Sequence, residues 1–256
     1  MFQRFYTYIF ISFCIVTLLC SGCSHTYVIK NVSSINHEEV KGNPRIALVG
    51  FYPYTSTLVD KTYSQNYTEY KYSIDIDKNY SLKSFCSVGK DIKELTSKGI
   101  RKDVDEAKIK LFITSVVDKT GNSILSELNW MFTVKDNKTY LNDIDADYFL
   151  VGIFSPYKES RSNKNYNFFV ELIIYMTLGI IPQRTFYESE ATFYLYDRNL
   201  NEVHTFTYSF DYEKIEGLFV DQKNDIRSTD SVCPPPLVWI PHVKKLNTEL
   251  ISYLNK

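Results

Sequence analysis

The alternation of apolar and polar stretches along the chain predicts several strands. Two continuous apolar runs, residues 46–51 and 146–154, have the pattern of strands buried on both faces. Residues 63–80 alternate between apolar and polar positions, which is typical of a strand with one face in solvent. A second alternating stretch, residues 190–212, is interrupted at 197–201 by residues that favour turns, so it predicts a β-hairpin.

Other stretches have the spacing of helices. Residues 104–118 and 242–254 carry apolar side chains close to a helical stripe, and residues 83–98 are expected to form a shorter helix. Strands and helices that alternate in this way predict an α/β or α+β fold, with a mixed β-sheet on which helices pack. The length and the ordinary hydrophobic content of 44% fit a single mixed domain over residues 44–256.

The most apolar stretch after the amino terminus is Phe168 to Pro182. It has 15 residues and includes Glu171, so it is too short and too polar to cross a bilayer comfortably as a helix. Two interpretations remain open: a core strand with its turn, or a segment that lies in the membrane interface.

The amino terminus has the three parts of a secretory signal. Arg4 supplies the positive charge, Tyr8 to Cys20 is almost wholly apolar, and the small residues Ser21 and Gly22 lead into Cys23. This layout resembles a bacterial lipoprotein signal, in which the cysteine is lipidated with acyl chains such as palmitate and becomes the first residue.

The resemblance implies a signal peptide over residues 1–22 and a lipid anchor at Cys23, followed by a polar tether over residues 23–43. Cys20 departs from the pattern, because Leu is usual at that position. A simple secretory signal and an uncleaved anchor helix are the alternatives. Ser24 after the cysteine favours the outer membrane, with either the periplasmic or the surface face exposed.

Charge and cysteine content indicate which binding partners and which covalent cross-links to expect. The net charge is −1 and no basic stripe is visible, so we expect no nucleic-acid partner. Tyrosine and phenylalanine are abundant, which favours a β-rich fold. In an exported chain Cys86 and Cys233 are candidates for a disulfide, and two separate thiols are the alternative.

No stretch of the sequence has the spacing of a known catalytic, metal or cofactor motif. The run from Asp143 to Asp147 begins like a calcium loop, but Tyr148 stands where such a loop needs glycine, and the run beginning at Asp75 fails in the same way. We expect turn or strand-edge carboxylates there, with no metal and no cofactor.

Two single residues are candidates for reactive groups. His204, on the hairpin near Asp197, is better explained as a polar residue on a strand face than as a general base. Cys86 would be nucleophilic if Lys90 lowered its pKa, but a buried or bridged cysteine is the simpler interpretation. We therefore expect a protein that is not an enzyme.

Two features resemble a known kind of envelope domain. The buried strand 45–51 followed by helices and the run 146–152, together with the hairpin 193–210, looks like the small α/β domain of the curli-secretion lipoprotein and of the amino-terminal part of the Tol-system propeller protein. The whole layout, rich in Lys, Asn and Tyr, resembles lipoproteins of leptospires and related spirochaetes.

The resemblance implies a cell-envelope protein more than a reaction. The leading expectation is a lipid-anchored envelope lipoprotein with a non-enzymatic binding or structural role and an envelope or host protein as its partner. One alternative is an oligomeric accessory of envelope assembly or secretion, and the other is a lipid-handling protein that uses residues 168–182.

Overall fold

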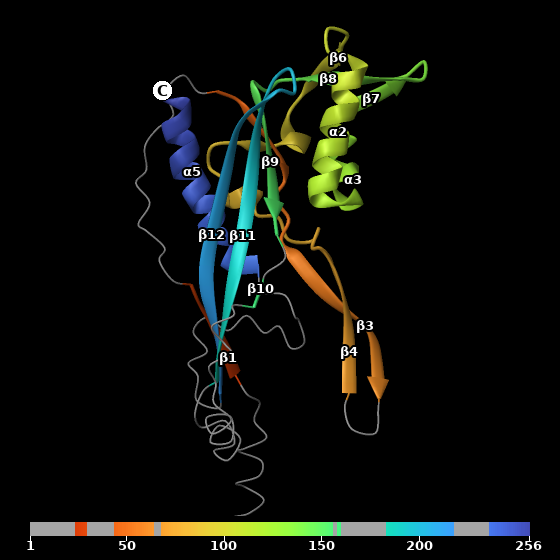
Figure 1. Cartoon of the computed structure of the whole chain (residues 1–256). Coiled ribbons are helices and arrows are strands. Elements are labelled where there is room, and N and C mark those ends of the chain that lie inside the picture. Colours follow the sequence, from red (N-terminus) through yellow and green to blue (C-terminus); the bar gives the residue numbers. More distant parts are fainter. Residues whose placement is uncertain (1–23, 30–43, 64–67, 156–157, 160–182, 218–235) are drawn as a thin grey trace, which may run out of the picture. The chain divides into compact units, whose positions relative to one another are not determined.

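The computed structural model describes residues 24–29, 44–63, 68–155, 158–159, 183–217 and 236–256 (Figure 1). The chain falls into two compact units. Of the described residues, the first unit comprises 24–29, 158–159, 183–188 and 211–217, and the second comprises 44–63, 68–155, 189–210 and 236–256. The second unit holds most of the range that the sequence predicts as one domain.

A mixed sheet of five strands forms the centre of the second unit. Its order is β12 (Glu202–Gly217), β11 (Gln183–Asp197), β9 (Tyr148–Phe154), β2 (Ile46–Gly50) and β5 (Lys90–Asp91), and the first two strands enter it with the parts that belong to this unit. β2 is parallel to both β9 and β5, whereas β9 is antiparallel to β11. The expected mixed α/β fold is therefore confirmed.

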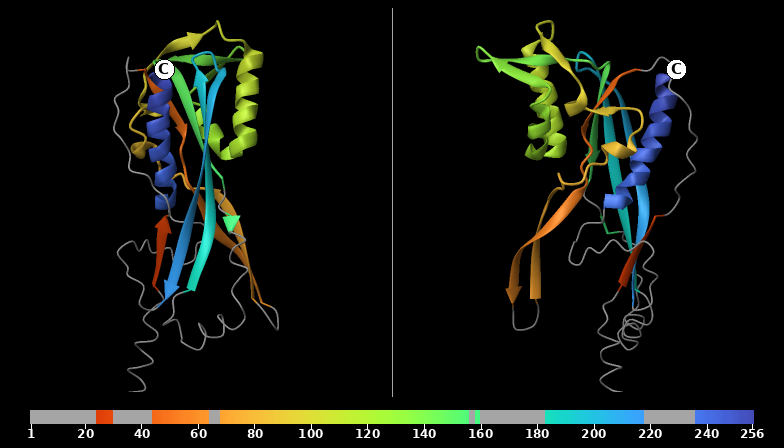
Figure 2. Two further views of the ribbon diagram at one scale, coloured as in Figure 1. Left: turned by 60° about the vertical axis from the view of Figure 1, so that its left-hand side comes forward. Right: turned by 180° about the vertical axis from the view of Figure 1, so that it is seen from behind.

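Helices cover both faces of this sheet. Figure 2 shows α5 (Ile240–Leu254) on one side and α2 (Glu106–Thr120) with α3 (Leu125–Leu128) on the other. The side chain of Asp105 caps α2 by accepting from the amide of Ala107, and Gly121 ends the helix with a φ of 75°.

The core beneath α2 and α3 is built from alternate residues of the two parallel strands and the inward stripe of α2. Its fully or nearly fully buried members include Ala47, Val49, Ile109, Phe112, Val116, Ile124, Leu128, Phe149 and Val151. The opposite face is aromatic: Phe154 packs edge-on against Trp239, which lies in the 3₁₀ turn η6 (Pro236–Trp239) before α5, with ring centroids 5.4 Å apart. Because both faces of β2 are covered, all five of its residues are buried, as its continuous apolar run predicts.

Two smaller antiparallel arrangements complete the second unit. β6 (Ser97–Arg101), β8 (Lys138–Ile144) and β7 (Phe132–Lys135) form a three-stranded sheet in the order β6-β8-β7. Asp136 and Asn137 join β7 to β8, both with positive φ, as a tight hairpin turn requires. β3 (Tyr54–Tyr63) and β4 (Thr68–Ile76) form a separate hairpin with a bulge between Leu58 and Asp60.

The expected helix over residues 83–98 is wrong. The segment instead contains the 3₁₀ turns η1 (Lys83–Phe85) and η2 (Ile92–Glu94), with β5 between them and the start of β6 after them. Gly89 explains the difference, because a Cβ at this position would lie 2.6 Å from the side chain of Leu48. The backbone therefore runs close against β2 and pairs with its edge, and this edge pairing replaces the hydrogen bonds of a helix.

The first unit contains a strand at the beginning of the predicted tether. β1 (Ser24–Ile29) pairs antiparallel with the last six residues of β12, from Ser24 opposite Gly217 to Ile29 opposite Tyr212. β10 (Lys158–Glu159) pairs with β11 at Tyr187 and Glu188. The polar composition of residues 23–43 predicted no structure here, but β1 draws its hydrogen bonds from β12, a partner nearly 200 residues further along the chain.

The predicted interface or core segment, Phe168 to Pro182, lies outside the described residues, as do residues 1–23 and 30–43. Among the helices that the structure does describe, none has the length and apolar character needed to cross a membrane.

Candidate functional site

The parallel pairing of β2 with β9 ends at Gly50, the last residue of β2, which lies directly opposite Gly152 of β9. Ligands of open α/β sheets bind outside the carboxyl ends of such strands. The backbone is unusual at this point, since Gly50 and the fully buried Phe51 both have positive φ, of 80° and 66°. A bulky residue in this conformation is strained, and strain of this kind gathers at functional sites.

Gly152 leaves space for the ring of Phe51. A Cβ on Gly152 would lie 2.6 Å from that ring, closer than any ordinary contact. The amide of Phe51 donates to the carbonyl oxygen of Gly152 at 3.2 Å, and its own carbonyl accepts from the amide of Leu82 at 2.8 Å. The strained residue is therefore fixed from both sides by backbone hydrogen bonds.

A buried carboxylate accepts a hydrogen bond from the same turn. Glu127, on α3, is 2% exposed, and its Oε2 accepts from the amide of Gly50 at 2.5 Å. Its Oε1 accepts from the hydroxyl of Tyr52 at 2.5 Å and from Nζ of Lys83 at 2.7 Å. Burial, and then the hydrogen bond to Glu127, raise the pKa of Tyr52 far above its ordinary value, so this tyrosine stays a hydroxyl donor.

Two further charges complete the cluster. Lys83, itself 6% exposed, also binds Oδ2 of Asp91 at 3.1 Å, and Nζ of Lys93 lies 3.5 Å from Oε1 of Glu127. Two lysines thus face two carboxylates, which balances the charge of a buried network. Both oxygens of Glu127 are occupied by donors, so this carboxylate is arranged to hold the Gly50–Phe51 turn rather than to exchange a proton with a substrate.

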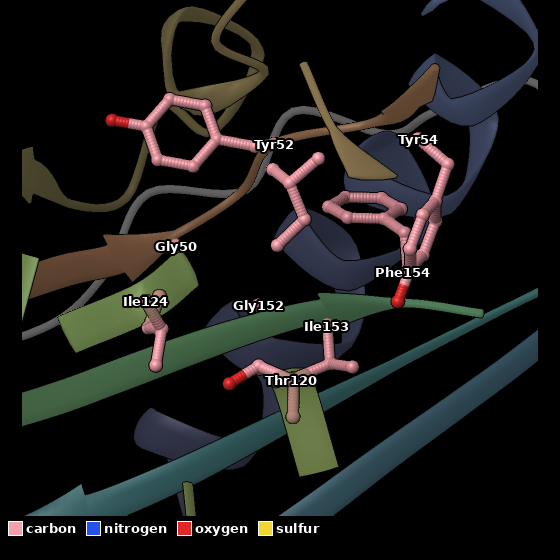
Figure 3. A pocket seen from close by; sticks show the side chains of 9 residues that line it. Gly50, Tyr52, Tyr54, Thr120, Ile124, Gly152, Ile153 and Phe154 are labelled. Atoms are coloured by element: carbon pink, nitrogen blue, oxygen red, sulfur yellow. The ribbon is translucent and has the colours of Figure 1, made fainter. Parts of the chain in front are cut away.

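A small hollow opens beside the turn, with about 260 Å³ of free space including its open side. Figure 3 shows the ring of Tyr52 turned away from Tyr54 and Phe154, while the side chains of Ile153 and Phe154 lie on opposite sides of β9. The hollow is lined by Gly50, Tyr52, Tyr54, Ile76, Thr120, Ile124, Gly152, Ile153 and Phe154. Pockets for small-molecule ligands enclose about 300 Å³ or more, whereas the free space here includes open solvent, so this hollow is too small to hold such a ligand.

No motif in the sequence predicts this cluster. Lys83 and Glu127 are 44 residues apart, and neither belongs to a motif. The only local signal is the dipeptide Gly50-Phe51 at the end of a buried strand, where a glycine indicates a special backbone conformation.

The acidic run from Asp143 to Asp147 lies at the other ends of the parallel strands. Asp147 accepts from the backbone and side chain of Arg45, and Asp145 contacts the same guanidinium. Asp143 binds Arg198 at 2.6 Å. All three carboxylates therefore bind arginine side chains at the ends of strands. Among the described residues, no group of three or more His, Cys, Asp or Glu is placed to hold a metal.

His204, the candidate base in the sequence, and His242 take different positions in the structure. His204 is exposed and stacks on Tyr253 with ring centroids 4.6 Å apart, whereas the carboxylate of nearby Asp197 accepts from amides in its own turn. His242 is fully buried on α5, and its Nε2 lies 3.1 Å from the carbonyl oxygen of Ser189 and 3.3 Å from its hydroxyl. The pair links α5 to β11 in the interior, where a substrate has no access.

The cysteines are only partly described. Cys86 is 3% exposed, and burial raises the pKa of its thiol to about 12, so it is not an activated nucleophile. Cys233 and Cys23 lie outside the described residues, so the disulfide and the lipid anchor stay predictions.

The comparisons with known proteins add no family to this picture. No protein-family model matches the chain, and no significant match was found among curated proteins or solved structures. The resemblance to envelope lipoproteins therefore stays a prediction from the sequence.

Proposed function

We propose that the protein is a lipid-anchored envelope lipoprotein of the outer membrane, with a non-enzymatic role in binding another envelope or host component. The single observation that carries the proposal is the signal-like amino terminus that ends in Ser21, Gly22 and Cys23. The proposal concerns location first, because the anchor sets which partners the protein can meet.

A binding role is favoured by large apolar side chains on the surface of the second unit. Leu111 and Val134 are each 72% exposed, and Trp130 is 54% exposed. Tryptophan is among the residues most enriched at the energetic centres of protein interfaces. The Glu127 cluster indirectly supports a non-enzymatic role, because donors already occupy both oxygens of this carboxylate and it fixes the Gly50–Phe51 turn.

Intact mass of the membrane-extracted protein tests the proposal. We expect a mature chain that begins at Cys23 and carries added acyl mass, and we expect a Cys23→Ala variant to lack that mass and to leave the membrane fraction. Cys14→Ala is the matched control, because it changes a cysteine in the apolar stretch that is removed with the signal peptide, away from the residues that precede Cys23. An unmodified chain, or one with its first 22 residues still attached, would contradict the proposal.

A further inference from the structure

The first unit has its regular structure immediately after the proposed lipid anchor. Ser24, the residue that follows Cys23, is already the first residue of β1 and is paired with Gly217 of β12. The six residues of β1 pair without a register shift up to Ile29 opposite Tyr212. No stretch of free chain is therefore left between the anchor and the sheet.

Side-chain contacts between β11 and β12 also stabilise the end of the sheet near Gly217. Arg184, near the start of β11, forms an ion pair with Glu213 of β12 at 3.3 Å. Further along the same two strands, the rings of Tyr187 and Tyr212 stack with centroids 5.2 Å apart. Since β11 begins and β12 ends at the same end of their hairpin, three neighbouring strands meet close to the residue that follows the anchor.

Chain geometry then limits how far this end can lie from the lipid. Consecutive Cα atoms are about 3.8 Å apart, and directly paired antiparallel residues are about 4.5–5.5 Å apart. Gly217 is therefore within about 10 Å of the Cα of Cys23. The headgroup layer on each side of a bilayer is about 5–7 Å thick. A flexible tether of about 20 residues would instead give a typical separation of about 25 Å.

We propose that the end of the first unit formed by β1 and the last residues of β12 stands in the lipid headgroup layer, so that the bilayer surface is itself a partner of this sheet end. The proposal rests on the lipid anchor at Cys23 proposed above. A covalent bond and strand pairing set this contact, so it does not depend on charge attraction and should persist at high salt.

The test measures how close β12 comes to the headgroups in the full-length lipidated protein. A bimane label is attached at Ile215→Cys, near the proposed contact, or at Val203→Cys, which lies on the same strand beside the turn at its other end. Both variants carry Cys233→Ser, and the buried Cys86 thiol reacts slowly because its pKa is raised to about 12. The protein is reconstituted into vesicles of phosphatidylethanolamine and phosphatidylglycerol with a nitroxide on the headgroup of a minor lipid.

We expect quenching at position 215 to exceed quenching at position 203 several-fold, with no change in 1 M salt. A ten-residue Gly-Ser linker inserted between Cys23 and Ser24, beginning with Ser, should abolish most of the difference. Equal quenching at the two positions, or quenching at 215 that the linker leaves unchanged, would overturn the contact. Intact mass of each sample separates the two proposals: acylated protein without the contact contradicts only this one, whereas protein without acyl mass contradicts both.

Discussion

The backbone amide of Gly50 donates to Oε2 of Glu127 at 2.5 Å, and this hydrogen bond joins the end of a central strand to a carboxylate 77 residues away. The same carboxylate neutralises Lys83, which is almost completely buried. Glu127 therefore performs two tasks at once: it compensates a buried charge, and it fixes the turn in which Phe51 is strained.

Removing the charge of Glu127 should destabilise the second unit strongly. In Glu127→Gln the buried ammonium of Lys83 keeps Asp91 but loses its nearer partner, at 2.7 Å. Breaking a buried ion pair on one side costs about 3–5 kcal/mol, and we expect the lower end of that range because Asp91 remains. Urea denaturation followed by circular dichroism measures the loss. Glu94→Gln, which changes an exposed carboxylate on η2, is the control, and equal stability of the two variants would contradict the role assigned to Glu127.

Gly152→Ala should destabilise the protein because its methyl group would enter the space of the Phe51 ring. The added Cβ would lie 2.6 Å from the ring, and overpacking of a core costs about 1–3 kcal/mol. Phe51→Leu replaces the ring with a smaller aliphatic side chain, so in the double variant the two losses should not add. Additive losses in a urea-denaturation cycle would show that the steric contact is not the cause. Gly121→Ala is the comparison for backbone strain without a steric contact, since that glycine has a φ of 75° and no atom within 4 Å of an added Cβ.

The sequence predicts the elements whose pattern depends on local burial, and it fails where distant pairing decides. The run Ile46-Ala47-Leu48-Val49 predicts a buried strand, and the prediction is confirmed because both faces of β2 are covered. The segment around Gly89 looks helical, but close packing on Leu48 makes it an edge strand. The same holds for β1, whose partner is β12. Neither the Glu127 cluster nor this pairing has a local signature, since their members meet only in the folded chain.

His242 should make stability depend on pH. Burial lowers its pKa from 6.5 to about 4, so the unfolded chain binds a proton between these values while the folded protein does not. Stability that is fully present above pH 6.5 is therefore lost as the pH falls toward 4, by about 3 kcal/mol in all. The free energy of unfolding, measured by urea denaturation from pH 5 to 7.5, should rise with pH. This slope should flatten in His242→Gln and persist in His204→Gln, whose histidine is exposed. A slope that survives in His242→Gln would assign it to another group.

Cys86 should be nearly inert toward alkylation in the folded protein. Its thiol is 3% exposed and its pKa is raised to about 12 by burial, so both access and the thiolate fraction are small. After reduction, iodoacetamide should modify Cys86 in the folded protein at least about tenfold more slowly than in urea, because each unit of pKa reduces the thiolate tenfold at neutral pH. Peptide mass spectrometry after timed quenching measures the rate at this residue, and Cys233 in the same sample gives an internal comparison. Fast modification of Cys86 under native conditions would show that the segment around η1 opens readily.

The unreduced sample also tests the predicted disulfide. A peptide that joins Cys86 to Cys233 would establish the bond, and two separately alkylated cysteines would contradict it.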